Sequence, residues 1–429
     1  MARDSLYPVS VKAGKPILGM LPTGWQKLSL EKCLNIEARK AYIQDNQEYD
    51  LVTVKRSRGG VIRREHLKGK DISVKSQFYI KEGDFLISKR QIVHGACGLV
   101  PKELSGSIVS NEYCVLTGKS GFYLPYMEFL SESLYFQQTC FHSSIGVHIE
   151  KMIFKLDSWF KWPFNIPPLS EQKRIVKILS TWDKAISVTE KLLTNSQQQK
   201  KALMQQLLTG KKRLLDEDGV RFSGEWVHGQ LGDLCAFKGG FAFKEVYQGQ
   251  SMGELPFIKV SDMNLLGNER NIEYSNNWVS FETAKLMKAK PFPESSIVFA
   301  KVGAALLLNR RRILLRPTII DNNMMAAVPS NAADTEFLYQ LLMAIDFARF
   351  VQEGAVPSIN QGDLSSFKLS YPYVEEQQKI AAVLSAADAE ISTLEKKLAC
   401  LKDEKKALMQ QLLTGKRRVK VDAEEAVSA

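Results

Sequence analysis

A dense run of basic side chains between residues 55 and 72 is the first feature of this sequence that could do chemistry. Its basic residues are Lys55, Arg56, Arg58, Arg63, Arg64, Lys68 and Lys70, and its acidic residues are Glu65 and Asp71. Lysine and arginine bind phosphate oxygens, and arginine also reads base edges in a DNA groove. Gly59 and Gly60 would let the backbone approach a sugar-phosphate surface. The run therefore predicts a DNA contact, with a solvated charged hairpin as the alternative.

A second group of candidate nucleic-acid ligands lies later in the chain. Arg310, Arg311 and Arg312 follow an apolar stretch, which predicts a strand end or turn near the surface. Gln361 lies on a polar loop, and an amide side chain can pair with adenine. A solvated loop tip is the alternative for the arginines. The run Lys89-Arg90-Gln91 is a weaker candidate in the first half.

The same sequence lacks the residues of a catalytic centre. A methyltransferase of DNA adenine would need an Asp/Asn-Pro-Pro-Tyr/Phe run, and Asn165-Ile-Pro-Pro168 is spaced wrongly for this. The run Gly118-Lys119-Ser120 ends like a phosphate-binding loop, but Tyr113 stands where the upstream glycine is required. The six cysteines contain no CxxC pair, which argues against a zinc site. We therefore expect a non-catalytic chain that holds no metal.

Composition and charge limit the class of protein further. The chain has 429 residues, of which 45% are hydrophobic and 24% charged, as is typical of two or three folded domains. No apolar run approaches the roughly eighteen residues that cross a bilayer, and the scattered cysteines fit a reducing cytoplasm. The net charge of +11 comes from the first half, with 23 basic against 16 acidic residues over 1–168 and ten against three over 169–215. A polyanionic partner is expected there.

An internal repeat sets the positions of these candidates. The twelve residues KKALMQQLLTGK occur at 200–211 and again at 405–416, at an offset of 205. The same offset aligns Glu171-Gln172 with Glu376-Gln377. Such identity at a fixed period indicates a duplicated unit.

Each repeated segment has the pattern of one long helix. Apolar residues recur about every 3.5 positions, the spacing of a coiled-coil seam. The predicted seam consists of Ile175, Leu179, Trp182, Ile186, Leu193, Leu203, Leu207, Ile380, Leu384, Ile391, Leu394, Leu398, Leu401, Leu408 and Leu412. Gly210 and Gly415 are well placed to end the two helices. We expect the helices to pack on each other; two amphipathic helices in separate cores are the alternative.

The repeats divide the chain into two globular parts and two helices. We expect a first domain over 1–168, a spacer helix over 169–215, a second domain over 216–372, a second spacer helix over 373–418 and a flexible tail over 419–429. Short alternating apolar runs predict β-dominated mixed domains, with a helix at about 334–352. The clearest predicted strands are 51–54, 85–87, 257–260 and 296–299.

This organisation resembles the specificity subunit of type I restriction-modification systems. The resemblance rests on Ile166-Pro-Pro-Leu-Ser-Glu-Gln-Lys-Arg-Ile175, on its weaker partner Tyr371-Pro-Tyr-Val-Glu-Glu-Gln-Gln-Lys-Ile380 and on the duplicated helix residues. Pro256-Phe-Ile-Lys-Val-Ser-Asp262 is similar to part of that family's target-recognition domains. The first domain departs from the second, because Ser143-Ser-Ile-Gly146 and the insert-like 157–164 do not match Pro357-Ser-Ile-Asn-Gln361.

The resemblance implies an α+β fold in which two target-recognition domains are separated by two long helices that form an antiparallel coiled coil. It also implies a cytoplasmic prokaryotic protein that reads a bipartite double-stranded DNA target. Two methyltransferase subunits with S-adenosylmethionine and two restriction subunits with ATP and Mg would dock on it, while the chain itself binds no cofactor. The exposed helix residues Lys173, Lys177, Lys200, Lys201 and 197–199 are candidate docking faces or solvated surface.

A protein-binding adaptor without sequence-specific DNA binding is the rival function. It would explain the two helices and the slightly acidic second domain, but not the basic run at 55–72.

Overall fold

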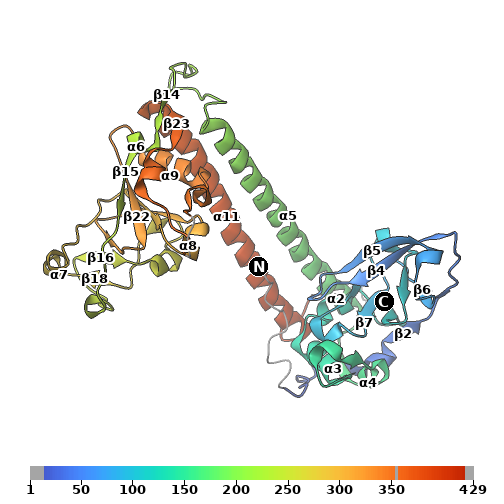
Figure 1. Ribbon diagram of the computed structural model, residues 1–429. Coiled ribbons are helices and arrows are strands. Elements are labelled where there is room, and N and C mark those ends of the chain that lie inside the picture. Colours follow the sequence, from blue (N-terminus) through green and yellow to red (C-terminus); the bar gives the residue numbers. More distant parts are fainter. Residues whose placement is uncertain (1–13, 353–355, 421–429) are drawn as a thin grey trace. The chain divides into compact units, whose positions relative to one another are not determined.

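The computed structural model describes residues 14–352 and 356–420. It forms two compact units, one within 1–189 and 397–429 and the other within 190–396. Each unit combines a β-rich domain with part of the long helices α5 (Leu169–Leu207) and α11 (Val374–Leu413), as Figure 1 shows. The predicted tail lies outside the described residues from position 421 onward.

The domain of the first unit is built around two larger sheets. One has the antiparallel order β2-β10-β7-β8, and the other has the order β3-β6-β9-β4-β5. These strands are β2 (Leu34–Glu37), β3 (Lys40–Ala41), β4 (Glu48–Val54), β5 (Val61–Lys68), β6 (Gln77–Tyr79), β7 (Phe85–Ser88), β8 (Cys97–Leu99), β9 (Ile108–Ser110) and β10 (Tyr113–Gly118). Strand β7 is buried along its whole length, because Phe85 and Ile87 pack into one core and Leu86 into another.

Short elements complete the first domain. Strands β1 (Gln26–Ser29) and β13 (Pro163–Ile166) form one pair, and β11 (Ser144–Ile145) and β12 (Ile153–Phe154) form another. The helices are α2 (Tyr126–Leu130), α3 (Leu134–His142) and α4 (Leu156–Phe160).

The domain of the second unit has a five-stranded sheet of order β15-β22-β19-β20-β17, a three-stranded sheet of order β18-β16-β21 and the pair β14-β23. Its strands are β14 (Val227–Gln230), β15 (Cys235–Gly239), β16 (Leu255–Ile258), β17 (Asn271–Ile272), β18 (Trp278–Val279), β19 (Ile297–Ala300), β20 (Arg311–Leu314), β21 (Ile319–Ile320), β22 (Met324–Pro329) and β23 (Lys368–Tyr371). Its helices are α6 (Leu231–Leu234), α7 (Phe281–Leu286), α8 (Ala304–Leu307), α9 (Thr335–Ala344) and α10 (Gln361–Ser365).

These elements confirm mixed β-rich domains and correct some predicted bounds. The strand expected at 257–260 ends at Ile258, and a 3-10 turn follows it. The helix expected at 334–352 ends at Ala344, because the chain becomes extended at Ile345 before a further 3-10 turn. The side chain of Asp334 caps the start of α9 by accepting the amide of Phe337.

The two domains share one strand order. Strands β2, β10, β7 and β8 of the first unit correspond to β15, β22, β19 and β20 of the second. Helices α4 and α10 also correspond, and their bounds differ by the repeat offset of 205. The segment 157–164, which the sequence suggested to be an insert, is therefore the counterpart of 362–369. The duplication extends from the helices into the domains.

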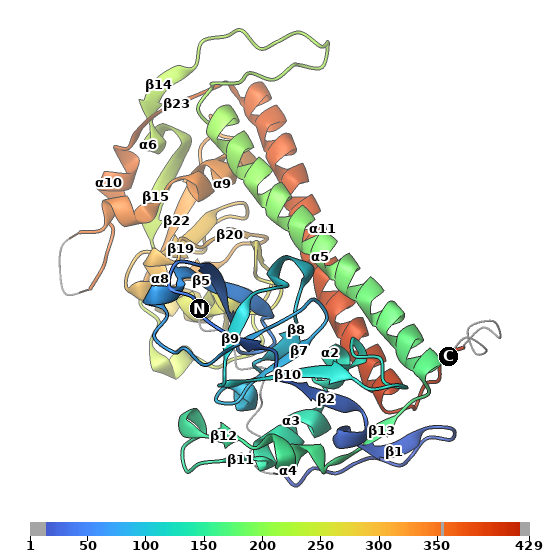
Figure 2. The same ribbon diagram turned by 90° about the vertical axis from the view of Figure 1, so that its right-hand side faces the viewer.

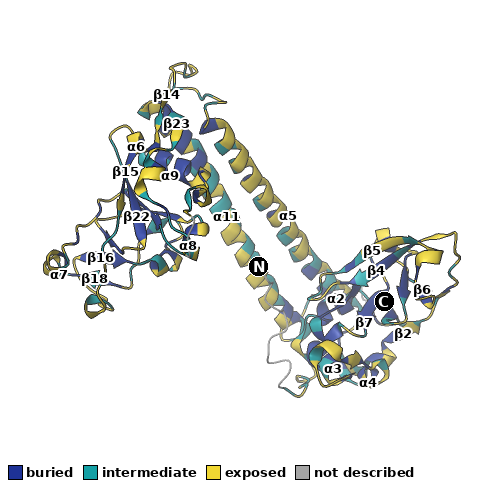
Figure 3. Cartoon of the chain, viewed as in Figure 1, coloured by how far each residue is buried: buried dark blue, intermediate teal, exposed yellow. Residues whose placement is uncertain are grey.

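Helices α5 and α11 run side by side in opposite directions (Figure 2). Within the first unit Lys405 contacts Asp183, and within the second unit Lys200 contacts Asp388. Every predicted seam side chain is buried or half-buried, and the outward faces are exposed (Figure 3). The most buried seam residues are Ile175, Leu179, Leu207, Ile380, Leu384 and Leu412.

Candidate nucleic-acid interface

The basic run at 55–72 lies on the β4-β5 hairpin and, for Lys70, on the 3-10 turn Gly69–Asp71 that follows it; the turn of the hairpin is fixed to the rest of the domain. Ser57 and Arg58 have positive φ values of 55° and 52°, which residues other than glycine seldom adopt. Their amides donate to the carbonyl oxygens of His94 (2.7 Å) and Gly95 (2.9 Å). A Cβ at Gly59 would lie 2.7 Å from the Cβ of Lys55, so the turn has no room for a side chain there. The hairpin therefore presents its charges from a defined backbone.

Several of these charges form ion pairs at the surface. Arg56 contacts Glu150 at 2.6 Å and Arg63 contacts Asp50 at 2.8 Å, while Arg64 reaches the neighbouring carboxylate at 3.4 Å. The three arginine side chains are 51–56% exposed. Exposed pairs of this kind contribute only about 0–1 kcal/mol. A DNA phosphate could therefore replace the carboxylate at little cost.

The remaining basic residues of the hairpin differ in their surroundings. Lys55, Lys68 and Lys70 are exposed, and within the described residues no ion pair engages them. Arg58 is half-buried and donates to the carbonyl oxygen of Ser131 at 2.9 Å. Its guanidinium thus stabilises the turn by a hydrogen bond to a distant segment.

His66 adds a charge that depends on pH. It lies on β5, where its ring nitrogens contact Asp50 at 2.6 Å and Glu48 at 3.2 Å. These hydrogen bonds to carboxylates raise the pKa of His66 above its ordinary value. The hairpin therefore becomes more positive as the pH falls through the raised pKa of His66.

The three consecutive arginines of the second domain do not form a surface cluster. Arg310 is exposed, but Arg311 is 1% and Arg312 9% exposed, because both lie on β20 inside the five-stranded sheet. Arg311 donates to the carbonyl oxygens of Asn309 and Ile345, and Arg312 donates to that of Met263 at 3.2 Å. The expectation of surface positions was wrong for Arg311 and Arg312.

Burial also changes the acidity of these two side chains. Desolvation lowers the pKa of Arg311 to about 10, so that this side chain stays protonated at neutral pH, and it lowers the pKa of Arg312 as well. The Arg311 guanidinium lies 3.8 Å from the ring centroid of Phe347. This contact and the carbonyl acceptors stabilise the buried cation, and the charge of Asp346 favours it as well.

Gln361 is exposed at the start of α10, beside Lys301. A Cβ added to Gly239 would lie 3.0 Å from Nζ of Lys301 and 3.6 Å from the amide of Gln361. The two polar groups therefore gather over a glycine at the end of β15. Lys301 stands in an apolar run, and a single lysine there gave no signal in the sequence.

The helix residues considered for docking fall into two classes. Lys173, Lys177, Lys201 and residues 197–199 are exposed. The side chain of Lys200 is only 15% exposed and is bound to Asp388. Lys200 is therefore an internal contact of the second unit and not part of an open face.

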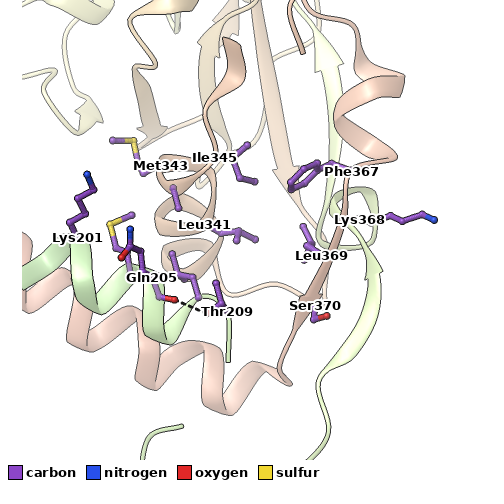
Figure 4. A pocket seen from close by; sticks show the side chains of 13 residues that line it. Lys201, Gln205, Thr209, Leu341, Met343, Ile345, Phe367, Lys368, Leu369 and Ser370 are labelled. Carbon is purple, nitrogen blue, oxygen red and sulfur yellow. Dashed lines mark hydrogen bonds between the residues drawn. The ribbon is translucent and has the colours of Figure 1, made fainter. Parts of the chain in front are cut away.

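One hollow of about 640 Å³ lies in the second unit between the end of α5, the end of α9 and β23 (Figure 4). Its lining includes Leu208, Leu341, Met343 and Phe367, and Lys201 and Lys368 are the titratable residues in it. This lining offers no general acid paired with a base and no activated nucleophile.

Among the described residues, no helix has the length and hydropathy needed to span a membrane.

Comparison with known proteins identifies the family. A family model for the type I restriction modification DNA specificity domain matches residues 22–195 and again 223–402. The chain therefore belongs to this family and is a non-catalytic DNA specificity subunit of a type I restriction-modification system. This assignment decides against an adaptor that lacks sequence-specific DNA binding.

Individual relatives agree with the assignment. The chain is 28% identical over 317 residues to the type I restriction enzyme MjaVIII specificity subunit of Methanocaldococcus jannaschii, covering 70% of each chain. It is 25% identical over 228 residues to the EcoR124I/EcoR124II specificity subunit of Escherichia coli, covering 51% of this chain and 52% of the relative. The fold is similar to a type I system S subunit from M. genitalium, with a TM-score of 0.56 and 14% identity over 93% of this chain and 99% of that chain.

Proposed function

We propose that each domain recognises one half of a bipartite double-stranded DNA target and that α5 and α11 fix the gap between the halves. The observation that carries this proposal is the duplication. The two domains share one strand order but differ in their surface residues, and each lies beside one of two nearly identical helix segments. A repeated scaffold can hold two readers in equivalent settings, while the differences between the domains allow two different half-sites.

For the first domain, the proposed DNA contacts are the exposed charges of the β4-β5 hairpin. Lys55, Lys68 and Lys70 would bind phosphates directly, and the exposed Arg56, Arg63 and Arg64 would exchange their surface carboxylates for DNA. For the second domain, Arg310 and Gln361 are the proposed contacts. Arg58, Arg311 and Arg312 would act by holding the backbone that presents these side chains.

We further propose that two methyltransferase subunits, which bind S-adenosylmethionine, and two restriction subunits, which use ATP and Mg, assemble on this chain. The exposed residues Lys173, Lys177 and Lys201 mark helix faces that are open to such partners. The chemistry would then belong to the partners, and this chain would supply the target.

A domain exchange tests the bipartite reading. Residues 1–165 are replaced by the corresponding domain of another specificity subunit, and the hybrid is expressed with its methyltransferase subunits. Long-read sequencing that detects methylated adenine should then show one half-site changed and the other half-site and the gap retained. Exchange of 216–372 is the matched control and should change the opposite half. If either exchange alters both halves, the proposal is wrong.

A further inference from the structure

One lysine occupies the same place in both domains. Lys89 directly follows β7, and Lys301 directly follows the corresponding strand β19. The amide of Lys89 donates to the carbonyl oxygen of Glu112 at 2.9 Å, and the amide of Lys301 donates to that of Asn323 at 2.9 Å. Both acceptors immediately precede the neighbouring strand, β10 or β22. The two lysines are thus equivalent in backbone environment.

A second hydrogen bond fixes each lysine to the segment before the short helix. The carbonyl oxygen of Lys89 accepts the amide of Phe154 at 2.8 Å, and that of Lys301 accepts the amide of Ile359 at 3.1 Å. Positions 154 and 359 differ by 205, the offset of the repeated helices. Two backbone hydrogen bonds therefore hold each lysine at the junction of three segments that come from distant parts of the sequence.

The lysine is exceptional because the surrounding strands have diverged. When the four equivalent strands are aligned by their pairing registers, each position holds one residue type in the first domain and a different type in the second. For β7 and β19, the sequences are Phe-Leu-Ile-Ser followed by Lys89 and Ile-Val-Phe-Ala followed by Lys301. Apolar strand positions can exchange freely as long as the core is filled. A half-buried lysine has no such packing reason to be the identical residue.

The side chains of both lysines lie among polar groups. The ammonium group of Lys89 donates to the carbonyl oxygen of Asn111 at 2.6 Å. The ammonium group of Lys301 lies over Gly239, where even a Cβ would approach it to 3.0 Å. Neither lysine forms an ion pair with a carboxylate within the described residues. Each ammonium group can therefore meet an external anion without first breaking a salt bridge.

The residues beside the lysines differ between the domains. Asn360 and Gln361 follow the segment bound to Lys301, and Lys155 and Leu156 stand at the equivalent positions near Lys89. Phosphate contacts position a protein on DNA without sequence information, and base contacts specify the sequence. We propose that Lys89 and Lys301 are matching phosphate contacts in the two half-sites and that side chains that differ between the domains, such as the exposed Gln361, read bases. This inference rests on the bipartite function proposed above.

Salt dependence of DNA binding tests the inference. The full-length chain is purified with its methyltransferase subunits, and its affinity is measured for a duplex with the methylated target and for a scrambled duplex. Each phosphate contact contributes about 0.9 to the slope of log affinity against log salt. Lys89→Gln and Lys301→Gln should each lower the slope by about this amount on both duplexes. A rise from 50 to 200 mM salt should then weaken variant binding about threefold less than wild-type binding.

Five further variants complete the test. Lys81→Gln and Lys285→Gln remove one exposed charge from each domain and should leave the slope unchanged. Lys301→Arg keeps the charge and should keep the slope. Gln361→Ala should change the preferred bases of one half-site and leave the slope unchanged. If Lys301→Gln melts at a lower temperature than the wild type, Lys301→Met is used in its place, because methionine keeps the aliphatic part of the lysine side chain and removes the charge.

The outcomes separate the inference from the function beneath it. If the wild-type complex does not prefer its target over the scrambled duplex, the proposed function fails. If it does prefer the target and the lysine variants keep the wild-type slope, the phosphate role is wrong. Loss of affinity for the target alone would also overturn that role, because it would make the lysines base readers.

Discussion

At the scale of single residues, Arg311 shows that a positive charge beside a proposed DNA contact, Arg310, can serve the core. Its guanidinium lies on the ring of Phe347 and donates to the carbonyl oxygens of Asn309 and Ile345. These acceptors belong to the segments that precede β20 and follow α9. Arg311 therefore connects two loops that an uncharged side chain would leave without donors.

Substitution of Arg311 should lower stability and not merely DNA affinity. Arg311→Ala removes buried hydrogen bonds to two carbonyl groups and leaves a cavity, so we expect a loss of about 2–4 kcal/mol in the free energy of unfolding. Arg310→Ala, at an exposed position, should change it by no more than about 0.5 kcal/mol and should weaken DNA binding. Chemical denaturation and a DNA-binding assay on the same samples distinguish the two. Equal stability of both variants would contradict the structural role of Arg311.

At the scale of elements, the antiparallel helices are aligned by contacts that occur once in each unit. Lys405 binds Asp183 in the first unit as Lys200 binds Asp388 in the second. These pairs are related by the offset of 205. Two copies of the same helix that pack antiparallel make every such contact twice. If a lysine of the first copy opposes an aspartate of the second, the equivalent lysine of the second copy opposes the equivalent aspartate of the first.

The ends of the helices repeat a second set of contacts. Arg418 binds Glu171, which also accepts the indole N–H of Trp25 at 3.2 Å. The equivalents in the second unit are Arg213, Glu376 and Trp226, with the arginine 2.6 Å from the carboxylate. Glu171 is 7% and Glu376 3% exposed, so each carboxylate is paired where it is buried. The tryptophan that opens each domain is thereby anchored to its helix pair.

A charge exchange tests whether the lysine–aspartate contacts set the alignment. Lys200→Asp places two carboxylates together and should lower the melting temperature. Adding Asp388→Lys should recover part of the loss, with a coupling of about 1 kcal/mol. Recovery should be partial, because Asp388 also accepts the amide of Gln340 at 2.7 Å.

The equivalent exchange of Asp183 and Lys405 provides the matched comparison. Its effect should be smaller, since Asp183 is 48% exposed against 30% for Asp388. If the double variant of Lys200 and Asp388 melts no higher than Lys200→Asp alone, the pair does not contribute to the alignment.

At the scale of the whole molecule, the chain is a duplication in which the helices stayed alike and the domains diverged. The helix copies share twelve consecutive identical residues, whereas the equivalent strands near Lys89 and Lys301 retain the order of the sheet but not its side chains. This division suits a protein with a constant frame and two independent readers, as proposed above.

The proposed ruler predicts how the target changes when both helices are lengthened. One heptad is inserted after Lys191 and one after Lys396, which are equivalent positions of the repeat. The insertion adds about 10 Å by helical rise and preserves the seam. The gap in the methylated target should lengthen by about one to three base pairs, as read by long-read sequencing.

A heptad in only one helix is the control for this insertion. It shifts the two seams against each other, separates charge pairs such as Lys200 and Asp388, and should reduce the melting temperature. A target with an unchanged gap after the double insertion would refute the ruler.

Much of the architecture could be predicted because its signals are local or repeated. The seam of α5 and α11 is visible in residues three and four apart, and Gly210 and Gly415 have the positive φ values (70° and 66°) that a helix end favours. Alternating apolar residues also revealed strands such as β4 and β19. These features depend on near neighbours in the chain, so the sequence by itself determined them.

The tertiary structure alone decided which charges face outward and which positions correspond between the domains. Arg311 is buried through contacts with residues more than thirty positions away, and Lys200 is covered by a helix that begins at Val374. Lys89 and Lys301 become equivalent only through hydrogen bonds between distant segments. A run of charged residues in the sequence carries no information about such contacts, because the burial of a side chain depends on which distant segments pack against it.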